Sequence, residues 1–134
     1  MDRSPASKIR AANAALLVDR EVDRIGEFFA PDYVAHLTDH DRKGHGWIRE
    51  FLGMLQRGFP DLRVEVEILL EGKDRVAWQR TLRGTHSGDF LGFPASGRPI
   101  VWRDLFTSRF QGGLVAEDWV ISDLAERLLL ARKG

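Results

Sequence analysis

The chain lacks cysteine altogether, which excludes disulfide bonds, thiolate nucleophiles and cysteine-based zinc or iron–sulfur sites. It also lacks an excess of charge, because 20 lysines and arginines balance 20 aspartates and glutamates over 134 residues. Proteins that bind nucleic acids or membrane surfaces usually carry a basic excess or a basic face. We therefore expect no nucleic-acid or membrane partner, and we expect any chemistry to depend on carboxylate or histidine side chains.

Long apolar segments are missing as well, since no run approaches the roughly 20 residues that span a bilayer. The first five residues, Met1 to Pro5, contain no apolar stretch of the kind found in secretory signals. A content of 43 % hydrophobic and 30 % charged residues is typical of a soluble chain that buries one core. We expect a single domain over residues 1–134, located in the cytoplasm.

Motifs for cofactors and nucleophilic serines are also absent: the chain has no G-x-G-x-x-G, no G-x-x-x-x-G-K-[ST], no H-E-x-x-H and no G-x-S-x-G. His36, His40 and His45 lie among aspartates, which would suggest a metal site if they shared one helix face. Their segment follows Pro31 and runs through β-favouring residues, which favours a polar loop with His36 at its start. We therefore expect no metal and no organic cofactor.

What is present is a change of periodicity along the chain. Apolar residues at helical spacing predict three helices before residue 60: one from Ile9 through Leu17, a short one over 22–29 that Pro31 ends, and one from Trp47 to Gly58. Alternation then predicts four strands over 64–68, 76–84, 100–110 and 114–121, with an ordered loop over 86–98, a turn at 111–113 and a closing helix from Asp123.

Helices followed by an antiparallel meander predict an α+β domain whose N-terminal helices wrap one face of the sheet. If such a sheet is strongly curved, a cavity remains between it and the helices. That cavity is where we expect the function to lie.

Charged residues interrupt apolar rows on three of the predicted strands. Arg80 shares a strand face with Trp78, and Asp104 shares one with Trp102 and Phe106. A buried guanidinium needs a carboxylate partner or a polar cavity, and a desolvated carboxylate can transfer protons. An ion pair on the outer surface of the sheet is the alternative interpretation.

The last strand carries an acid on each face. Asp118 and Val120 share one face, whereas Glu117 and Trp119 share the other. Periodicity alone leaves open which pair points inward.

Two further features have competing interpretations. The tryptophans on the strands are typical of a core, although they also suit the wall of an aromatic-ligand pocket. His86 comes where the second strand enters the loop over 86–98, and it either contacts a substrate or anchors the loop by hydrogen bonds.

Several stretches carry a family resemblance in register from about residue 9 to residue 130. They are Phe28-Phe29-Ala30-Pro31-Asp32-Tyr33-Val34-Ala35-His36, Arg83-Gly84-Thr85-His86, Gly88-Asp89-Phe90-Leu91-Gly92-Phe93-Pro94-Ala95-Ser96-Gly97-Arg98 and Glu117-Asp118-Trp119-Val120-Ile121-Ser122-Asp123. Together they resemble the SnoaL-like polyketide cyclases of the nuclear-transport-factor-like superfamily. The resemblance implies a cone-shaped α+β fold, a homodimer formed through the sheet, and ring closure of an aromatic polyketide by intramolecular aldol condensation without a cofactor.

The resemblance also implies a carboxylate on the last strand as general acid and base. Members of the family often carry that aspartate directly after the tryptophan, where this chain has Val120, so that Asp118 is the nearest acid on the same strand face. His36 matches the Tyr-Val-x-His pattern of the family and is expected at the cavity mouth.

These considerations define the predicted site. Asp118, Asp104 and His36 are the candidate catalytic residues, with Asp118 as acid and base. The candidate substrate contacts are Arg80, Trp78, Trp102, Phe106, Val120 and His86. The predicted function is acid–base chemistry on a small apolar or aromatic carbonyl compound, and the alternatives are a module that binds a hydrophobic small molecule without converting it and a structural dimerisation domain.

Overall fold

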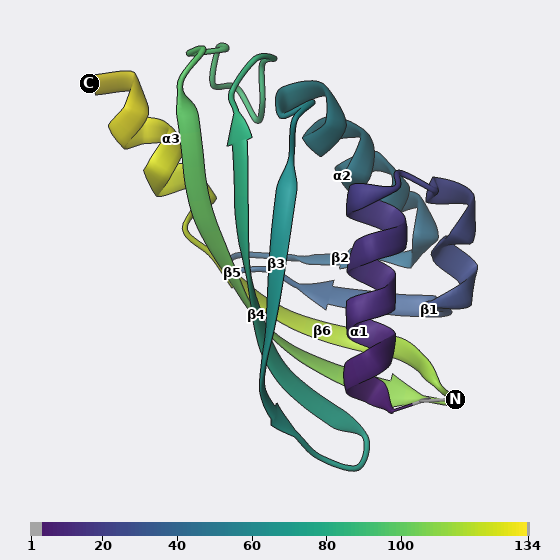
Figure 1. Cartoon of the computed structure of the whole chain (residues 1–134). Helices are drawn as coiled ribbons and strands as arrows, with labels where there is room; N and C mark the ends of the chain where they lie inside the picture. The colour runs from purple at the N-terminus through teal and green to yellow at the C-terminus, as the bar shows by residue number, and fades with distance from the viewer. Residues whose placement is uncertain (1–3, 134) are drawn as a thin grey trace.

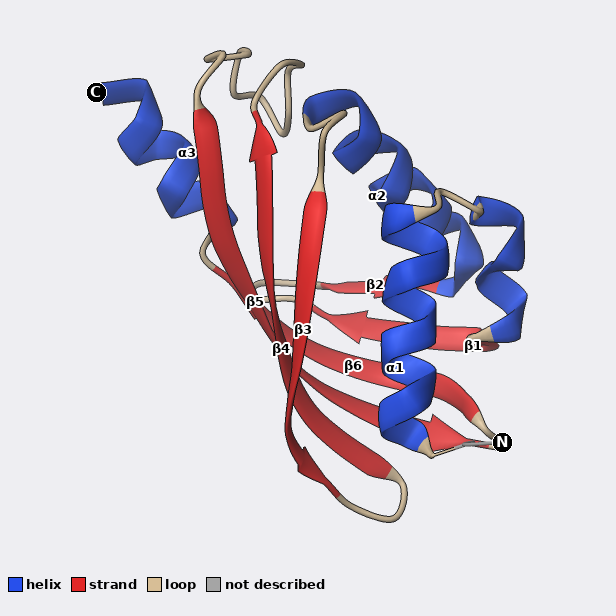
Figure 2. Ribbon diagram, in the orientation of Figure 1, coloured by secondary structure: helices blue, strands red, loops and turns tan. Residues whose placement is uncertain are grey.

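A curved, six-stranded sheet with helices against its concave side forms the body of the molecule (Figure 1). The computed structural model describes residues 4–133. The strand order is β2-β1-β6-β5-β4-β3, and the bounds are β1 Phe29–His36, β2 Asp41–Lys43, β3 Arg63–Glu71, β4 Arg75–Thr85, β5 Pro99–Gln111 and β6 Leu114–Ser122. The sheet does not close, and the helices complete the enclosure, as the cone-shaped α+β prediction required (Figure 2).

Two helical segments cover the concave face, and both confirm predicted helices. Helix α1 (Pro5–Asn13) begins where the Ser4 hydroxyl accepts the Ser7 N–H and proline occupies the first turn, and the π-helical turn η1 (Ala14–Val18) continues it. Helix α2 (Gly44–Gly58) starts three residues before Trp47 and ends at the predicted glycine. Helix α3 (Leu124–Lys133) lies at the far end of β5 from the β5–β6 hairpin (Figure 1).

The predicted meander is confirmed, because β3, β4, β5 and β6 pair consecutively and antiparallel. The β5–β6 hairpin turns through Gly112 and Gly113, whose φ angles are 60° and 77°. This left-handed pair matches the twist of the strands and is accessible chiefly to glycine.

The segment between residues 22 and 43 differs from the prediction. In place of the predicted second helix there is a short 3-10 helix, η2 (Val22–Glu27). Pro31 does not end a helix but lies inside strand β1, which begins at Phe29. Proline is tolerated there because the pairing of β1 with β6 is irregular between Phe29 and Val34, so the missing N–H leaves no ladder hydrogen bond unmade. Since β1 runs parallel to β6, the sheet is mixed and not wholly antiparallel.

The loop over 86–98 is ordered, as predicted. The N–H groups of Ser87 and Gly88 both donate to the carbonyl oxygen of Gly58, at 2.9 and 3.2 Å. A side chain at Gly88 would place its Cβ 2.2 Å from the carbonyl oxygen of Arg57, so only glycine allows this approach. The loop is thereby fixed to the C-terminal end of α2.

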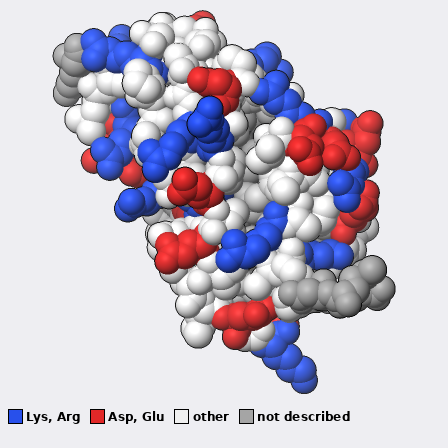
Figure 3. All heavy atoms as spheres, viewed as in Figure 1, with Lys and Arg blue, Asp and Glu red and all other residues white. Residues whose placement is uncertain are grey.

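Two surface observations bear on partners. On the face shown in Figure 3, acidic and basic side chains lie next to one another instead of forming a patch of one sign. Within residues 4–133, none of the helices combines the length and apolar character needed to cross a bilayer.

Candidate functional site

The space between the concave sheet and the helices is a cavity of about 470 Å³, which lies within the usual size range of small-molecule sites. Its wall is predominantly apolar and aromatic. Trp78 and Phe106 stack in parallel at a ring distance of 4.2 Å, and the buried Trp102 also reaches the cavity. Charged side chains on this wall include Arg80, Asp104 and Asp118, the three that interrupt apolar rows on the strands.

The inward face of β6 carries Asp118 and Val120, whereas Glu117 lies on the outer face and Trp119 is partly exposed. This placement shows which of the two pairs points inward, a question that strand periodicity left open. Val115 lines the cavity too, because the ladder skips Ala116: Phe110 pairs with Val115 and Arg109 with Glu117. The extra residue is a β-bulge, which re-aims the side chains that follow it.

Asp118 is buried and accepts hydrogen bonds at both carboxylate oxygens. Tyr33 Oη donates to Oδ2 at 2.6 Å, and Ser108 Oγ donates to Oδ1. The indole N–H of Trp78 donates to Ser108 Oγ at 2.9 Å, and indole nitrogen can only donate. The serine hydrogen is therefore directed to Asp118, and both neighbours act as donors toward the carboxylate.

Burial raises the pKa of Asp118 from 3.8 to about 6, against the hydrogen bonds from Ser108 and Tyr33 and the positive charge of Arg80, which lower it. A carboxyl group with such a pKa gains and loses a proton close to neutral pH, which is the requirement for general acid–base catalysis. Burial and the neighbouring carboxylate hold the pKa of Tyr33 well above its usual value, so its hydroxyl remains a donor.

Arg80 and Asp104 form a buried ion pair on the same wall. Arg80 Nε donates to Asp104 Oδ2 at 2.8 Å, and Nη1 donates to Asn13 Oδ1 at 3.0 Å. Asn13 is itself fixed by a 2.9 Å bond from its Nδ2 to the carbonyl oxygen of Ile9. The guanidinium also lies over the rings of Phe106 and Trp78, at 4.8 and 5.7 Å from their centres. Among the residues that the structure describes, Asp104 and Asn13 are its hydrogen-bond acceptors, and a guanidinium has five N–H donors in all. Arg80 lines the cavity with donors still unused.

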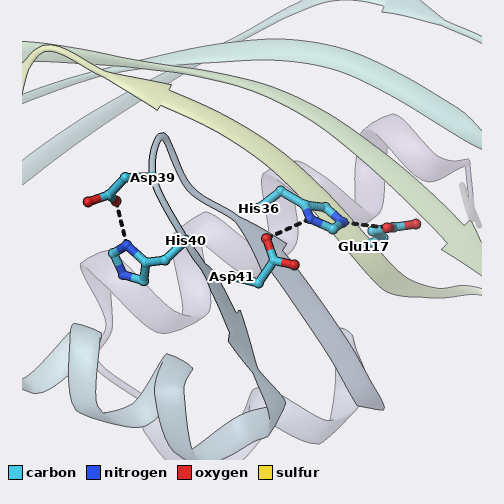
Figure 4. Close-up of polar contacts among 5 residues, drawn as sticks. All are labelled: His36, Asp39, His40, Asp41 and Glu117. Carbon is cyan, nitrogen blue, oxygen red and sulfur yellow. Dashed lines mark hydrogen bonds and ion pairs between the residues drawn. The ribbon is translucent and has the colours of Figure 1, made fainter.

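His36 does not reach the cavity, and its expected position at the mouth is wrong. Along β1 the buried side chains are Tyr33 and Ala35, so alternation turns His36 to the outer face. There its Nε2 lies 2.5 Å from Glu117 Oε2 and its Nδ1 lies 2.9 Å from Asp41 Oδ1 (Figure 4). Hydrogen bonds to Glu117 and then Asp41 raise the pKa of His36, which makes it part of an outer ion-pair network.

His40 and His45 have partners of their own, and His40 lines the cavity. His40 pairs with the neighbouring Asp39 (Figure 4), and His45 Nε2 donates to the carbonyl oxygens of Phe29 and Ala30. Within residues 4–133, side chains of the metal-binding types do not gather in groups of three or more.

His86 is not a cavity residue either, so the substrate contact expected of it is wrong. It is buried beside the loop, with its ring stacked on Phe59 at 5.5 Å, and Ser96 Oγ lies 3.2 Å from Nδ1. Its backbone N–H donates to Arg98 and its carbonyl accepts from Gly97. These bonds fit the alternative role of an anchor for the loop.

Sequence reasoning missed Tyr33, Ser108 and Asn13. The sequence marks the segment of Tyr33 as β-favouring but predicts no strand there, so the direction of the tyrosine side chain was not predicted. Ser108 continues the alternating row of Trp102, Asp104 and Phe106, and that spacing could have identified it. Asn13 follows Ile9 by four residues, so helical spacing could have placed it on the buried face of α1.

Comparison with known proteins agrees with this geometry. The profile of the SnoaL-like polyketide cyclases matches residues 7–129. The chain belongs to this family. Among curated proteins, no sequence matches significantly.

Solved structures with the same fold include family members and a protein of different assignment. IdmH from Streptomyces antibioticus, assigned as a polyketide cyclase, is 32% identical, with a TM-score of 0.78 over 97% of this chain and 99% of that chain. A protein from Jannaschia sp. CCS1, assigned as a SnoaL-like polyketide cyclase, is 29% identical, with a TM-score of 0.75 over 94% of this chain and 93% of that chain. AclR from Streptomyces galilaeus, assigned as a hydroxylase, is 27% identical, with a TM-score of 0.79 over 98% and 99%. The SnoaL-like fold therefore accompanies more than one assigned activity, and the reaction has to be argued from the site.

Proposed function

We propose that this SnoaL-like protein, acting as one domain over residues 1–134, catalyses acid–base chemistry on a small apolar or aromatic carbonyl compound, by aldol cyclisation or isomerisation. The observation that carries the proposal is Asp118: a buried carboxyl group with a pKa of about 6 on the wall of an aromatic cavity. Membership of a polyketide cyclase family supports the same class of reaction.

In the proposed reaction Asp118 removes a proton from the carbon next to a carbonyl group. The electron pair of that C–H bond moves toward the carbonyl oxygen and gives an enolate. In cyclisation the enolate carbon forms a bond to a second carbonyl carbon, and Asp118 returns its proton to the new alkoxide. In isomerisation Asp118 returns the proton to a different carbon. Both sequences restore the carboxylate and need no cofactor, because one group accepts and returns the proton.

Arg80 is proposed to bind the oxygen on which the negative charge develops. Arg80 lines the cavity, and some of its N–H donors make no hydrogen bond to the described residues. Preorganised donors in an enclosed site stabilise an oxyanion strongly. Asp104 is then a positioning residue and not a base, because its carboxylate is occupied by Arg80 Nε at 2.8 Å. Trp78, Trp102, Phe106 and Val120 would hold the flat apolar part of the substrate.

Hydrogen–deuterium exchange of 2-tetralone in D₂O tests this proposal, because the probe combines an aromatic ring with an acidic C–H next to a ketone. We expect the wild type to accelerate exchange and Asp118→Asn to lose at least about 100-fold, as for other general bases. Glu117→Gln is the matched control, since it neutralises the neighbouring carboxylate on the outer face and should retain the rate. Equal rates for Asp118→Asn and wild type would contradict the proposal.

A non-catalytic binding protein is the second candidate, and Val120 favours it. Val120 lies on the cavity wall at the position where the resembled cyclases often carry their aspartate. This candidate predicts that 2-tetralone raises the melting temperature of the wild type and is recovered without deuterium. Incorporation of deuterium above the protein-free rate would exclude it.

We also propose that the protein is a homodimer formed through the outer face of β5 and β6. Val101, Leu105, Trp119 and Ile121 are exposed there, and Leu105 is paired with Ile121 across the two strands. Adjacent exposed apolar side chains of this kind mark interaction surfaces. Light scattering should give a dimer for the wild type and a monomer for Ile121→Glu, with Leu70→Glu on β3 remaining dimeric; a monomeric wild type would contradict the assignment. We also propose a cytoplasmic location, the one expected from the sequence.

A further inference from the structure

A tight turn at the cavity mouth holds a leucine in a conformation that leucine disfavours. The N–H of Phe90 donates to the carbonyl of Phe93 at 3.0 Å, and the reciprocal bond is 2.8 Å. The two central residues are both left-handed, with φ of 49° at Leu91 and 81° at Gly92. This is the pattern of a type I′ turn, whose first central position is normally Asn, Asp or Gly.

The surroundings of the turn fix it in this conformation. Phe90 is buried, its ring lies 5.6 Å from that of Phe59, and a Cβ at Gly58 would approach it to 3.0 Å. Farther along the loop, the N–H of Ala95 donates to Asp89 Oδ1 at 2.9 Å. A strained backbone persists only where its surroundings over-determine it, and such positions concentrate at functional sites.

The side chain that results from this strain is both exposed and part of the cavity wall. Leu91 is 59% exposed, yet it lines the same cavity as Asp118 and Arg80. On α2, Phe51 and Met54 also line this cavity and are only partly buried. Leu91 lies outside the buried core cluster, and a ligand in the cavity would cover part of its exposed apolar surface.

We propose that Leu91 is a specificity residue. The strained turn positions its side chain to contact substrates whose ring system extends from the buried cavity to its mouth. This inference rests on the proposed use of the cavity as the substrate site. Within the proposed class of aromatic carbonyl compounds, it favours the longer members, with the enolisable carbonyl group at the inner end. Burying the exposed part of one leucine side chain corresponds to about a tenfold gain in affinity.

Two probes with the same reactive end separate this contact from the rest of the site. 2-Tetralone supplies the carbonyl group and two rings, and 6-benzyloxy-2-tetralone adds an apolar arm. Dissociation constants are measured for the wild type, for Leu91→Asn, for Leu91→Met and for Leu70→Asn, which makes the same substitution at an exposed leucine of β3 away from the cavity. Melting temperatures are measured for the four proteins without ligand.

The wild type should bind the benzyloxy compound about tenfold more tightly than 2-tetralone. Leu91→Asn should abolish most of that preference. It should also raise the melting temperature by about 3 °C, because asparagine tolerates the left-handed conformation. Leu91→Met should keep the preference, as should Leu70→Asn. A wild type without the preference, a Leu91→Asn protein that retains it, or a lower melting temperature for Leu91→Asn would each overturn the inference.

These outcomes are distinguishable from failure of the proposed function, because they concern binding and not exchange. A wild type that prefers the benzyloxy probe without exchanging its protons contradicts only the proposed chemistry. A wild type that exchanges 2-tetralone without preferring the longer probe contradicts only the role of Leu91.

Discussion

Tyr33 Oη lies 2.6 Å from Asp118 Oδ2, although 85 positions separate the two residues in the chain. The contact exists because β1 runs parallel to β6 and places Ala35 opposite Asp118. The β1 segment thus supplies a donor to the candidate base, in addition to covering the edge of β6. The strength of that donor can be tested directly.

Tyr33→Phe should raise the pKa of Asp118 further above about 6, because the hydrogen bond favours the charged carboxylate. The loss of one hydrogen bond should also lower the free energy of unfolding by about 1 kcal/mol. A ¹³C NMR titration of the Asp118 carboxyl carbon measures the pKa, and urea denaturation measures the stability. An unchanged or lower pKa in the variant would show that the tyrosine does not act on the carboxylate as described.

Ser108→Ala should be more damaging than Tyr33→Phe. It removes a donor to Asp118 and also leaves the buried N–H of Trp78 without its acceptor. An orphaned buried donor costs about 1–3 kcal/mol, in addition to the lost bond. Urea denaturation of both variants gives the comparison, and a Ser108→Ala protein that is at least as stable as Tyr33→Phe would contradict the directional chain from Trp78 to Asp118.

Asp118 should make the protein less stable as the pH rises. A carboxyl group whose folded pKa is raised from 3.8 to about 6 contributes fully at pH values below 3.8, and the contribution is lost as the pH passes through 6. The difference corresponds to about 3 kcal/mol, so Asp118→Asn should gain stability relative to the wild type between about pH 4 and pH 7. Denaturant unfolding of both proteins at several pH values measures this gain in stability.

Glu117→Gln should change the pH dependence of stability in the opposite direction to Asp118→Asn. Hydrogen bonds from His36 and then Arg109 lower the pKa of Glu117, so its contribution is present above its unfolded pKa and is lost as the pH falls. The variant should therefore be less stable than the wild type near neutrality and approach it in acid. If stability relative to the wild type changed with pH in the same direction for both variants, the two faces of β6 would not differ as assigned.

Breaking the buried ion pair of Arg80 and Asp104 should lower the free energy of unfolding more than breaking an exposed ion pair. Both side chains are about one-tenth exposed or less, at 11% and 6%. Asp104→Asn leaves the guanidinium uncompensated, which costs about 3 kcal/mol, and adding Arg80→Met should recover part of that loss. Asp23→Asn, which breaks the exposed pair with Arg49, should cost less than about 1 kcal/mol. Equal losses from the two single substitutions would contradict a buried pair.

His36 should have no role in the exchange reaction. Its ring is on the outer face between Asp41 and Glu117, so His36→Gln should leave 2-tetralone exchange within about twofold of the wild type. Because the pKa of His36 is raised, its stabilising contribution is present below its unfolded pKa of about 6.5 and is lost as the pH rises through the folded value. His36→Gln should therefore destabilise the protein in mild acid more than at alkaline pH.

Helices α1, α2 and α3 and the meander were predictable because each has a strong period of its own, whereas the helix predicted over 22–29 is only a 3-10 helix followed by β1. The site was less predictable, since its parts depend on non-local pairing. Asp118 could be singled out as an acid on an apolar row, but the bulge at Ala116 breaks the alternation that would have oriented it. Tyr33 belongs to a strand that contains proline and is held by pairing with the last strand of the chain, a relation that no local pattern records. His36 was assigned to the wrong face for the same reason.

The pH dependence of 2-tetralone exchange tests the central claim most directly. After subtraction of the protein-free rate, exchange by the wild type should rise with an inflection near pH 6, where Asp118 becomes ionised, and the inflection should move upward in Tyr33→Phe. Exchange by Asp118→Asn should be close to the protein-free rate throughout. A wild-type rate that is flat between about pH 5 and pH 7.5, or one that Asp118→Asn reproduces, would contradict the assignment of Asp118 as the base.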